Sequence, residues 1–334
     1  MARTFQVLGR PGRDNALWVR IDTGQGFHRF LFDCGEGCAR GVERSELMEL
    51  DHLCFSHFHL DHVAGFDGLF RRIYNRPNPP IHVWGPKRTV DLMECRFQSF
   101  WWNLHQGQGG EWEVRDLLEK GMGNGGRFET TRAFARDDLS GVERAEGGVI
   151  WNEPAFCLAS VILEHHGPCV GYVLREKARQ HIRAERLAEL GLRAGPWLRE
   201  LKEGNDVSVE AGDGRIFSQE ELRDELIVKE EGDSIAYLTD FLPDEAAFSK
   251  LVPFLQGVRT LVCESQYRHA DWELAKKHCH GTARRTGELA AQAGVKRLIL
   301  MHLSDRYSDR DWKGMLKEAR RSFPETRFPS HWDL

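Results

Sequence analysis

The segment Ser56-His57-Phe58-His59-Leu60-Asp61-His62 places three histidines and one aspartate directly after a short apolar run at 52–55. A His-x-His-x-Asp-His string arises by chance in a chain of this length at a rate on the order of one in a thousand. A solvated polar loop is the alternative, but so many imidazoles on one turn have no packing use. Histidine and aspartate side chains commonly bind metal ions, so the segment predicts a metal site at the end of a strand.

The spacing of these ligands predicts two neighbouring ions. In an extended segment His57 and His59 project the same way and can bind one ion. Asp61 and His62 follow as the chain turns into a helix, where they can point at a second ion. Imidazoles together with a carboxylate suit zinc, or another borderline divalent ion such as manganese or iron.

Three later residues, each after an apolar run, are candidates to complete the set: His165, Asp240 and His302. Functional loops of α/β folds leave from such strand ends. Taken alone, each residue is as often an ordinary turn or capping residue as a ligand. Taken with the first segment, they supply enough ligands for two metal ions.

The rest of the chain predicts an α/β protein with two packed sheets covered by helices. Strands are expected at 5–8, 17–21, 30–32, 52–55, 81–84, 155–163, 171–174, 235–238, 260–263 and 298–301. Helices are expected at 87–97, 178–190, 282–293 and 309–321. The Gly-rich stretch at about 101–148 is predicted to be an irregular insertion.

Length and composition fit one globular domain over 1–334. The chain is 41% hydrophobic and 29% charged, and it has neither a signal-peptide pattern nor an apolar run of membrane-spanning length. Its eight cysteines are scattered, which favours a reducing cytoplasm over a disulfide framework. The net charge of −5 gives no global attraction to nucleic acid, so RNA binding would need local basic patches.

Several further segments resemble the metallo-β-lactamase superfamily and, within it, the ribonuclease Z family. Phe32-Asp33-Cys34-Gly35-Glu36-Gly37 is similar to the aspartate motif that follows an early strand. Leu163-Glu164-His165 with Gly171-Tyr172 is similar to the third motif, and His280-Gly281-Thr282 to the His-x-Thr motif. The resemblance implies a four-layer αβ/βα metallo-β-lactamase sandwich.

The resemblance also implies roles for the candidate residues. His57, His59 and His165 would bind one ion, Asp61, His62 and His302 the other, and Asp240 both. Asp33 would orient residues of the first motif. The catalytic residues would be Asp61, His280 and Glu264. Two neighbouring ions would lower the pKa of a water molecule and neutralise phosphate oxygens. His280, oriented by Glu264, would protonate the leaving 3′ oxygen.

The segment 195–204, which begins Gly195-Pro196, is similar to the flexible arm of ribonuclease Z, the exosite that grips the tRNA body. An arm over about 175–230 is therefore expected, with Gly195, Pro196 and Lys202, together with Arg306, as substrate-binding residues. Residues 175–203 hold eight Lys or Arg against five Asp or Glu, which is locally basic. A helical surface lobe of mixed charge is the alternative.

The implied activity is removal of the 3′ trailer from precursor tRNA, by an enzyme that in this family commonly forms a homodimer. The chain departs from the family at Leu60, at Phe66-Asp67-Gly68 and around Asp240. A hydrolase of a small ester, cyclic phosphodiester, sulfate or lactone is therefore the alternative. A metal-free RNA-binding scaffold is disfavoured because every ligand position is filled. An iron-dependent redox relative is a further alternative, but one well-known redox branch of the superfamily carries Glu where this chain has His59.

Overall fold

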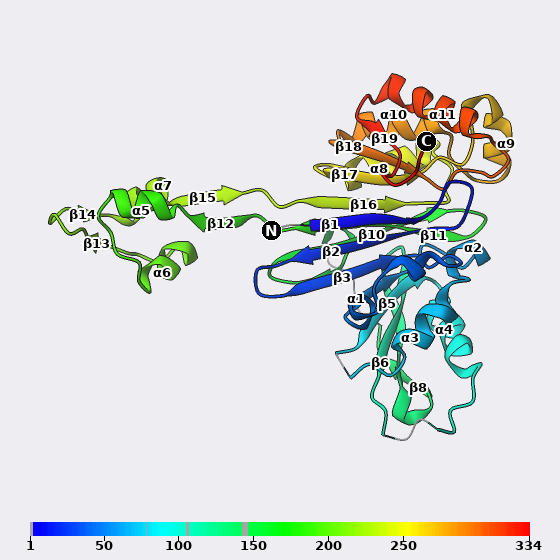
Figure 1. Ribbon diagram of the computed structural model, residues 1–334, viewed down its shortest axis with the longest axis horizontal. Helices are drawn as coiled ribbons and strands as arrows, with labels where there is room; N and C mark the ends of the chain where they lie inside the picture. Colours follow the sequence, from blue (N-terminus) through cyan, green and yellow to red (C-terminus); the bar gives the residue numbers. More distant parts are fainter. Residues whose placement is uncertain (1–2, 78, 105–106, 142–145) are drawn as a thin grey trace. The chain divides into compact units, whose positions relative to one another are not determined.

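The computed structural model describes residues 3–77, 79–104, 107–141 and 146–334 (Figure 1). It contains two compact units. The larger comprises Met1–Glu153, Cys157–Arg175 and Ser234–Leu334, and the smaller comprises Pro154–Phe156 and Glu176–Asp233. The two large sheets lie almost entirely in the larger unit, and the smaller unit coincides closely with the expected arm. Among the described residues, no helix has the length and apolar character needed to cross a membrane.

The first sheet is built from the N-terminal half of the chain, and its strands lie in chain order. Its central pairs, from β3 to β6, are parallel, and the flanking pairs are antiparallel. The strands are β1 (Arg3–Gly9), β2 (Asn15–Asp22), β3 (Phe27–Phe32), β4 (His52–Cys54), β5 (Ile81–Pro86), β6 (Glu111–Leu118), β7 (Gly121–Glu129) and β8 (Arg136–Leu139).

The second sheet has the order β19-β18-β17-β16-β11-β10-β9. The strands from β16 to β19 are parallel to one another, while β11 and β16 are antiparallel. The strands are β9 (Val149–Asn152), β10 (Phe156–Glu164), β11 (Pro168–Glu176), β16 (Ser234–Leu238), β17 (Thr260–Glu264), β18 (Arg297–Met301) and β19 (Thr326–Arg327).

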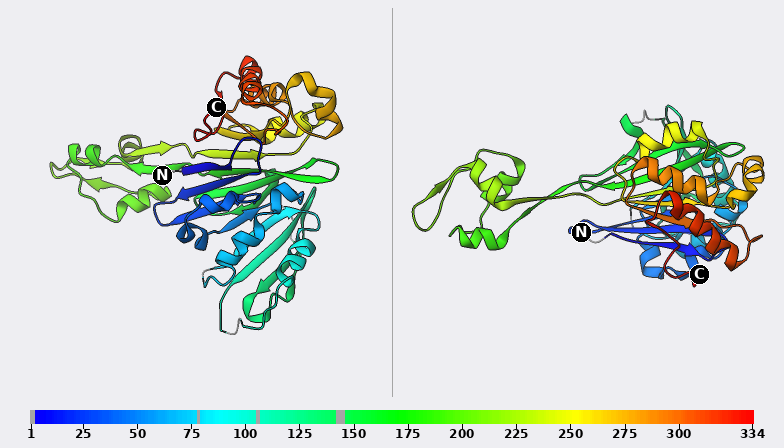
Figure 2. Two further views of the ribbon diagram at one scale, coloured as in Figure 1. Left: turned by 45° about the vertical axis from the view of Figure 1, so that its right-hand side comes forward. Right: turned by 90° about the horizontal axis from the view of Figure 1, so that it is seen from above.

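Helices cover the outer faces of both sheets (Figures 1 and 2). On the first sheet lie α1 (Arg44–Met48), α2 (Leu60–Val63), α3 (Phe66–Ile73) and α4 (Thr89–Gln98); on the second lie α8 (Glu245–Leu255), α9 (Trp272–Lys277), α10 (Ala283–Ala293) and α11 (Asp309–Ser322). Turns of 3-10 helix occupy Cys38–Gly41, Thr130–Arg132, Glu146–Gly148 and His269–Asp271. The predicted four-layer αβ/βα sandwich is confirmed.

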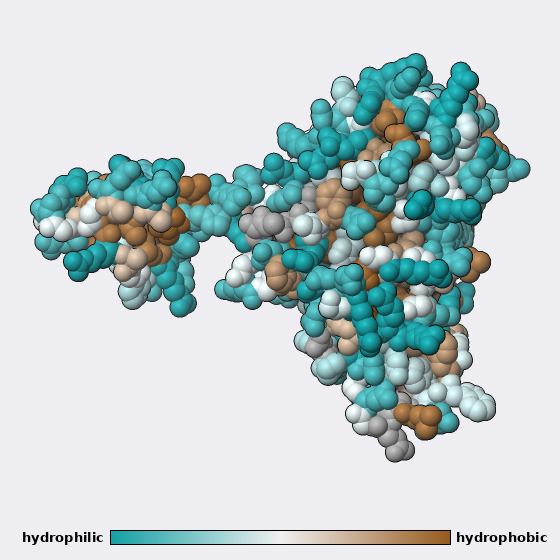
Figure 3. Space-filling view, in the orientation of Figure 1, coloured by the Kyte–Doolittle hydropathy of each residue, from teal (hydrophilic) through white to brown (hydrophobic). Residues whose placement is uncertain are grey.

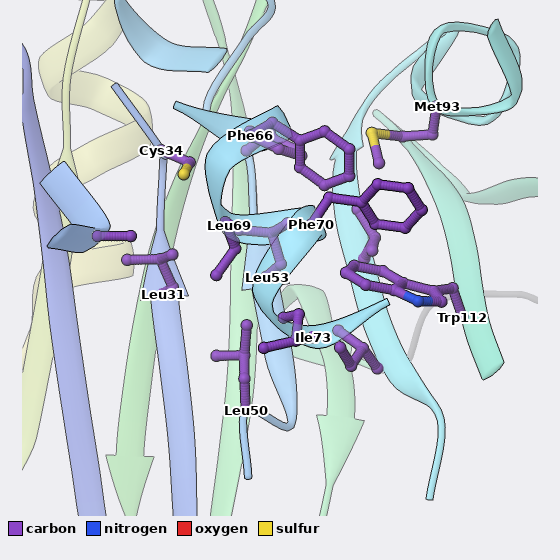
Figure 4. Close-up of a cluster of buried hydrophobic side chains, with 14 of the residues drawn as sticks. Leu31, Cys34, Leu50, Leu53, Phe66, Leu69, Phe70, Ile73, Met93 and Trp112 are labelled. Atoms are coloured by element: carbon purple, nitrogen blue, oxygen red, sulfur yellow. The ribbon is translucent and has the colours of Figure 1, made fainter. Parts of the chain in front are cut away.

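Helix α3 shows why these segments pack as they do. Its apolar residues Phe66, Leu69, Phe70 and Ile73 recur at helical spacing and are all buried against the first sheet (Figure 4). The ring of Phe70 lies 5.5 Å from that of Trp112 in β6, centroid to centroid. Burial of this apolar face therefore holds the helix on the sheet.

Aromatic residues also join the two sheets. The ring of Phe32, at the end of β3, lies 5.6 Å from the rings of both Tyr172 and Tyr237 in the second sheet. The Tyr172 hydroxyl donates a hydrogen bond of 2.7 Å to the carbonyl of Phe55. These contacts fix the strand ends of one sheet against those of the other, where the candidate site lies.

The prediction of an irregular insertion over 101–148 is wrong for most of its described residues, which form β6, β7 and β8. Residues 105–106 and 142–145 of that stretch lie outside the described residues. The glycines of β7 have a packing cause: a Cβ on Gly126 would lie 2.8 Å from the Phe128 ring and 3.1 Å from Val90 of α4. Close approach to a neighbour explains glycine inside a strand.

The predicted helix 178–190 is wrong at its start. Residues Arg179–Ile182 form β12, which pairs with β15 (Ile227–Glu230), and only Ala184–Glu189 is helical, as α5. The smaller unit also contains α6 (Trp197–Glu203), β13 (Val209–Glu210), β14 (Ile216–Phe217) and α7 (Gln219–Leu226). It has its own core, formed mainly by Leu187, Leu190, Leu201, Leu222 and Leu226, and apolar residues surrounded by polar ones are visible on it in Figure 3.

Candidate metal centre

The candidate ligands lie where strands end. The segment His57–His62 follows β4 and enters α2, and His165 lies in the turn between β10 and β11. Asp240 follows β16, and His302 follows β18. Because the carboxyl ends of parallel strands meet at one edge of a sheet, Asp240 and His302, which follow the parallel strands β16 and β18, are brought to one place although they are far apart in sequence.

The carboxylate of Asp240 lies at the centre of the cluster. It is buried, and four imidazole rings approach it to within 3.4–3.6 Å. Its Oδ2 lies 3.6 Å from His57 Nε2, 3.4 Å from His62 Nε2 and 3.5 Å from His165 Nε2, and its Oδ1 lies 3.5 Å from His302 Nδ1. Asp61 Oδ2 lies 3.4 Å from both His62 Nε2 and His302 Nε2.

All seven side chains therefore meet. Their ligand atoms form two groups within which every pair lies no more than 4.8 Å apart: His57, His59, His165 and Asp240 in one, and Asp61, His62 and His302 in the other. A third group of the same span joins Asp240 and His302 to His280. Imidazole nitrogens and carboxylate oxygens at this spacing are the donor set of a site for divalent ions.

Unsatisfied nitrogens support a metal at this place. His57 Nε2, His62 Nε2 and His302 Nδ1 are buried, and none of them has a hydrogen-bond partner among the described residues. Buried polar atoms normally have a partner. A divalent cation bound between the rings would use these lone pairs, so the residues present fit a metal ion.

Burial and neighbouring charges shift the pKa values of His57 and Asp240 toward the forms that bind metal, whereas, despite burial, Asp240 and Asp33 raise the pKa of His62. Burial, and then the nearby His62, lowers the pKa of His57 to about 2, which keeps the imidazole neutral. Burial would raise the pKa of Asp240, but His302 and His62 hold it well below its usual range. Neutral imidazoles and ionised carboxylates are the metal-binding forms of these groups.

Asp33 lies beside the cluster and is hydrogen-bonded to residues that adjoin or belong to it. Its carboxylate accepts hydrogen bonds from the backbone N–H and the hydroxyl of Ser56, both at 2.7 Å, and from the Tyr237 hydroxyl at 2.8 Å. Its Oδ2 also lies 2.8 Å from His62 Nδ1. This contact leaves His62 Nε2 facing the cluster, which is how a carboxylate commonly orients a metal-binding histidine.

The backbone is left-handed at several of these positions. Asp33 has φ 57°, Asp240 φ 51° and His302 φ 52°, and each lies one or two residues after the end of a strand. Residues other than glycine adopt this conformation at an energetic cost, and such residues concentrate at functional sites. The strand ends are therefore bent to turn these side chains inward.

His280 and Glu264 form a pair beside the cluster. His280 Nδ1 lies 3.1 Å from Glu264 Oε2 and 3.9 Å from Asp240 Oδ2. Glu264 is fully buried, and its Oε1 accepts a hydrogen bond of 2.7 Å from the Phe241 N–H. Burial would lower the pKa of His280, but the charge and hydrogen bond of Glu264 raise it to about 9. Glu264 therefore favours the protonated form of the His280 ring beside the candidate metal centre.

The predicted substrate-binding residues are not part of the cluster. Gly195, Pro196 and Lys202 belong to the smaller unit. Gly195 and Pro196 directly precede α6, and Lys202 lies within it. Arg306 is in the larger unit, where its guanidinium carbon lies 5.5 Å from the centre of the Tyr267 ring. That ring is 5.9 Å from the ring of His280, so Arg306 lies near the pair formed by His280 and Glu264.

Sequence reasoning missed three supporting residues: Ser56, Tyr237 and Asn15. The buried Asn15 accepts a hydrogen bond of 2.9 Å from the backbone N–H of His302 through its Oδ1, which fixes the last candidate ligand. Nothing in the sequence near residue 15 indicates this contact, because its partner is 287 residues away. Ser56 could have been noticed, since a polar residue between a buried strand and a ligand needs a hydrogen-bond partner.

Comparison with known proteins agrees with the geometry. The profile of the metallo-beta-lactamase superfamily matches residues 10–121, which include His57–His62. Ribonuclease Z of Deinococcus radiodurans is 42% identical over 326 residues, which span 98% of this chain and 97% of that protein. Ribonuclease Z of Methanothermobacter thermautotrophicus is 29% identical over 89% of this chain and 83% of that protein.

Solved structures share the fold. YhfI from Bacillus subtilis, a metallo-beta-lactamase fold protein, aligns with a TM-score of 0.56 and 14% identity over 98% of this chain and 95% of that one. At this identity the likeness shows the fold alone. The fold and the donor groups together indicate that the cluster binds divalent metal ions.

Proposed function

The chain belongs to the ribonuclease Z family, and from this premise we propose that it is a metal-dependent endoribonuclease that removes the 3′ trailer from precursor tRNA. The observation that carries the proposal is the match of 42% identity along nearly the whole chain, arm included. The convergence of seven ligand side chains supports the same activity, because phosphodiester hydrolysis commonly uses two adjacent divalent ions.

The proposed metal ions are two Zn²⁺, with Mn²⁺ and Fe²⁺ as other borderline ions that the donors suit. One would be held by His57, His59 and His165 and the other by Asp61, His62 and His302, with Asp240 between them. When bound, such ions supply a nucleophile at neutral pH and neutralise the charge on the phosphate oxygens.

His280 is proposed to protonate the leaving 3′ oxygen. Glu264 holds its Nδ1, so Nε2 is the nitrogen free to donate the proton. The pKa of about 9 keeps the ring protonated at neutral pH until the proton is needed. Asp61 is 46% exposed at its side chain, unlike the buried Asp240, and is proposed to accept the proton of the attacking water.

The smaller unit is proposed to bind the tRNA body through Gly195, Pro196 and Lys202, and Arg306 to bind RNA near the cut. Lys202 is exposed on α6 and has no ion-pair partner within 4.0 Å in the described part of the chain. Arg306 is likewise exposed, and stacking on Tyr267 orders its guanidinium for a phosphate.

A cytoplasmic location and a homodimer belong to the same proposal. All eight cysteines are free thiols, which suits a reducing compartment. The dimer rests on the family alone, and light scattering coupled to size exclusion tests it: the proposal expects twice the 38.4 kDa of one chain. A mass of one chain across the working concentration range contradicts it.

The decisive experiment incubates the protein with a trailer-bearing precursor tRNA and Zn²⁺ or Mn²⁺, and maps the cut. Cleavage next to the discriminator base is expected. A protein that hydrolyses bis(p-nitrophenyl) phosphate but does not cut the precursor would instead be a small-ester hydrolase, the alternative drawn from Leu60 and the other departures.

Removal of the arm tests its role within the same assay. Arg175 and Ser234 are paired opposite one another in β11 and β16, so an Asn-Gly turn can replace residues 176–233 and close a hairpin. The expected result is a higher KM for precursor tRNA, with hydrolysis of bis(p-nitrophenyl) phosphate retained. An unchanged KM for the precursor would contradict a role of the arm in RNA binding.

A further inference from the structure

A hollow of about 320 Å³ lies beside the metal-binding turn, outside the candidate centre. Residues 36–40, which lead into the 3-10 turn Cys38–Gly41, form one wall, and the middle and last turn of α3 form the other. The volume gives room for roughly ten waters at liquid density, and therefore for a hydrated anion. The charged side chains that line it are Glu36, Arg40, Arg71 and Arg72.

Two of these arginines have unpaired charges. Arg40 and Arg71 are exposed, and neither guanidinium has a hydrogen bond or an ion pair within the described ranges. The side chain of Arg40 folds over Gly37, where a Cβ would lie 3.7 Å from the Arg40 Nε. Glu36 is the one acid in the lining, so three positive groups face one negative group.

Arg72 is fixed in the wall by the backbone. Its Nη1 donates to the Ala39 carbonyl at 2.9 Å and its Nη2 to the Val42 carbonyl at 3.0 Å. These bonds join α3 to the loop, so the hollow has a rigid frame. They neutralise no charge, because both acceptors are neutral carbonyls, and the hollow keeps its positive potential.

The same frame is tied to the metal-binding turn. The Cys34 N–H donates to the His62 carbonyl, and the Gly65 N–H donates to the Cys34 carbonyl, both at 2.8 Å. Gly65 needs its lack of a side chain here, since a Cβ would lie 2.2 Å from the Gly35 carbonyl oxygen. A ligand in the hollow is therefore held at a fixed position relative to the candidate metal centre.

We propose that this hollow is a phosphate-binding site that holds a backbone phosphate of the RNA substrate, away from the phosphate that is cut. The inference rests on the proposed function for the identity of the RNA. Arginine is suited to such a site, because its planar guanidinium binds phosphate oxygens in pairs. A free inorganic phosphate offers the same chemistry, so the test must separate the two sources.

The variants follow from the geometry. Arg40→Gln with Arg71→Gln removes the two unpaired charges. Gly68→Glu places a carboxylate in the hollow, and Gly68→Ala is its matched control, because a Cβ at Gly68 meets nothing within 4 Å. Lys313→Gln with Lys317→Gln removes two exposed charges from α11 and controls for the loss of net charge.

Binding is measured on the metal-loaded protein with a precursor tRNA whose scissile phosphate is replaced by an uncleavable methylphosphonate. We expect the Kd of the double arginine variant and of Gly68→Glu to be about tenfold higher than that of the natural protein. This is the usual cost of losing one hydrogen bond to a charged group. The slope of log Kd against log salt should fall by about one. Gly68→Ala and the lysine variant should bind within about twofold of the natural protein.

The outcomes separate this inference from the proposed function. If the natural protein cuts precursor tRNA and the arginine variant binds it unchanged, the inference is overturned and the function stands. If the natural protein makes no cut but the variants still weaken RNA binding, the site stands and the function falls. If inorganic phosphate raises the Tm of the natural protein but not of Gly68→Glu, and RNA binding is unchanged, the site takes free phosphate and the RNA assignment is overturned.

Discussion

At the residue scale, Asp33 links the two sheets to the candidate ligands. Its carboxylate contacts Ser56 after β4, His62 in α2 and Tyr237 in β16. An ionised carboxylate only accepts hydrogen bonds and can accept several at once. No other side chain of this size could receive all of them, so Asp33 sets the orientation of the buried histidine.

Asp33→Asn is therefore expected to weaken metal binding without a change of volume. The amide NH₂ cannot accept a hydrogen bond, so either the Ser56 N–H loses its acceptor, or the Ser56 hydroxyl, the His62 ring and the Tyr237 hydroxyl lose theirs together. We expect a fall in metal affinity of about 10–100-fold, the usual cost of losing such an orienting group. A competition titration with a chelator measures it. Tyr237→Phe, which removes one hydrogen bond only, should cost less, and equal affinities in all three proteins would contradict the role.

His280 is expected to act on the reaction and not on metal content. His280→Gln should lower kcat by about 10²–10⁴, the range for a general acid. The metal content should stay as in the natural protein. His278→Gln is the matched control, because that ring is exposed and stacks on Tyr267. A loss of bound metal in His280→Gln would assign His280 to the ligands, and equal effects of both substitutions would deny it a special role.

At the element scale, a ladder of side chains ties β7 to the centre of the first sheet. His82, Glu113 and Arg127 are paired across β5, β6 and β7. Glu113 accepts a hydrogen bond of 2.6 Å from Arg127, and its other oxygen lies 3.4 Å from His82 Nδ1. Cross-strand pairs of opposite charge stabilise a sheet. Side-chain contacts therefore add to the backbone hydrogen bonds that hold the glycine-rich β7 in the sheet.

Glu113 makes this ladder sensitive to acid. Its hydrogen bonds, first with His82 and then with Arg127, lower the pKa of Glu113 from 4.5 to about 2. Because the folded-state pKa is depressed, the stabilisation is present above pH 4.5 and is lost as the pH falls toward 2.

Glu113→Gln should therefore lower the Tm at pH 7 by about 1–3 °C, and the difference should shrink between about pH 4.5 and pH 3. Thermal unfolding followed by circular dichroism measures it. Glu111→Gln is the control, since that carboxylate pairs with Arg127 but lies outside the His82 contact. A Tm difference that is constant across this pH range would contradict the ladder.

Some elements could be predicted from sequence and others could not, for physical reasons. The buried parallel strands are continuous apolar runs, so β4, β16 and β18 and the ligands after them were predictable. β7 was not, because Gly125 and Gly126 are selected by close packing and resemble a loop. β12 could not be distinguished from a helix, because its pairing partner, β15, lies more than forty residues away.

At the scale of the whole molecule, charge is divided unequally. Residues 176–233 hold ten Lys or Arg and fifteen Asp or Glu, a net of −5, which equals the net charge of the chain. The remaining residues hold 36 of each sign, from 46 − 10 and 51 − 15, and are neutral overall. Attraction to RNA must therefore come from local positive sites, such as the hollow lined by Arg40, Arg71 and Arg72.

Within the smaller unit the charge is divided again. The stretch 175–203, which includes β12, α5 and α6, is the basic part noted in the sequence, whereas residues 204–233 hold three Lys or Arg against ten Asp or Glu. The negative charges of this acidic stretch repel the phosphate backbone of RNA. RNA is therefore expected on the side that β12, α5 and α6 provide, and not on α7.

The proposed activity depends most on a pair of divalent ions held by seven side chains. Mass-spectrometric metal analysis of protein purified with and without Asp240→Asn tests this pair directly, because Asp240 contacts both ligand groups. We predict about two Zn²⁺ per chain in the natural protein and a clear loss in the variant. Fewer than one metal ion per chain in the natural protein after zinc loading, or equal content in both, would contradict a two-metal centre.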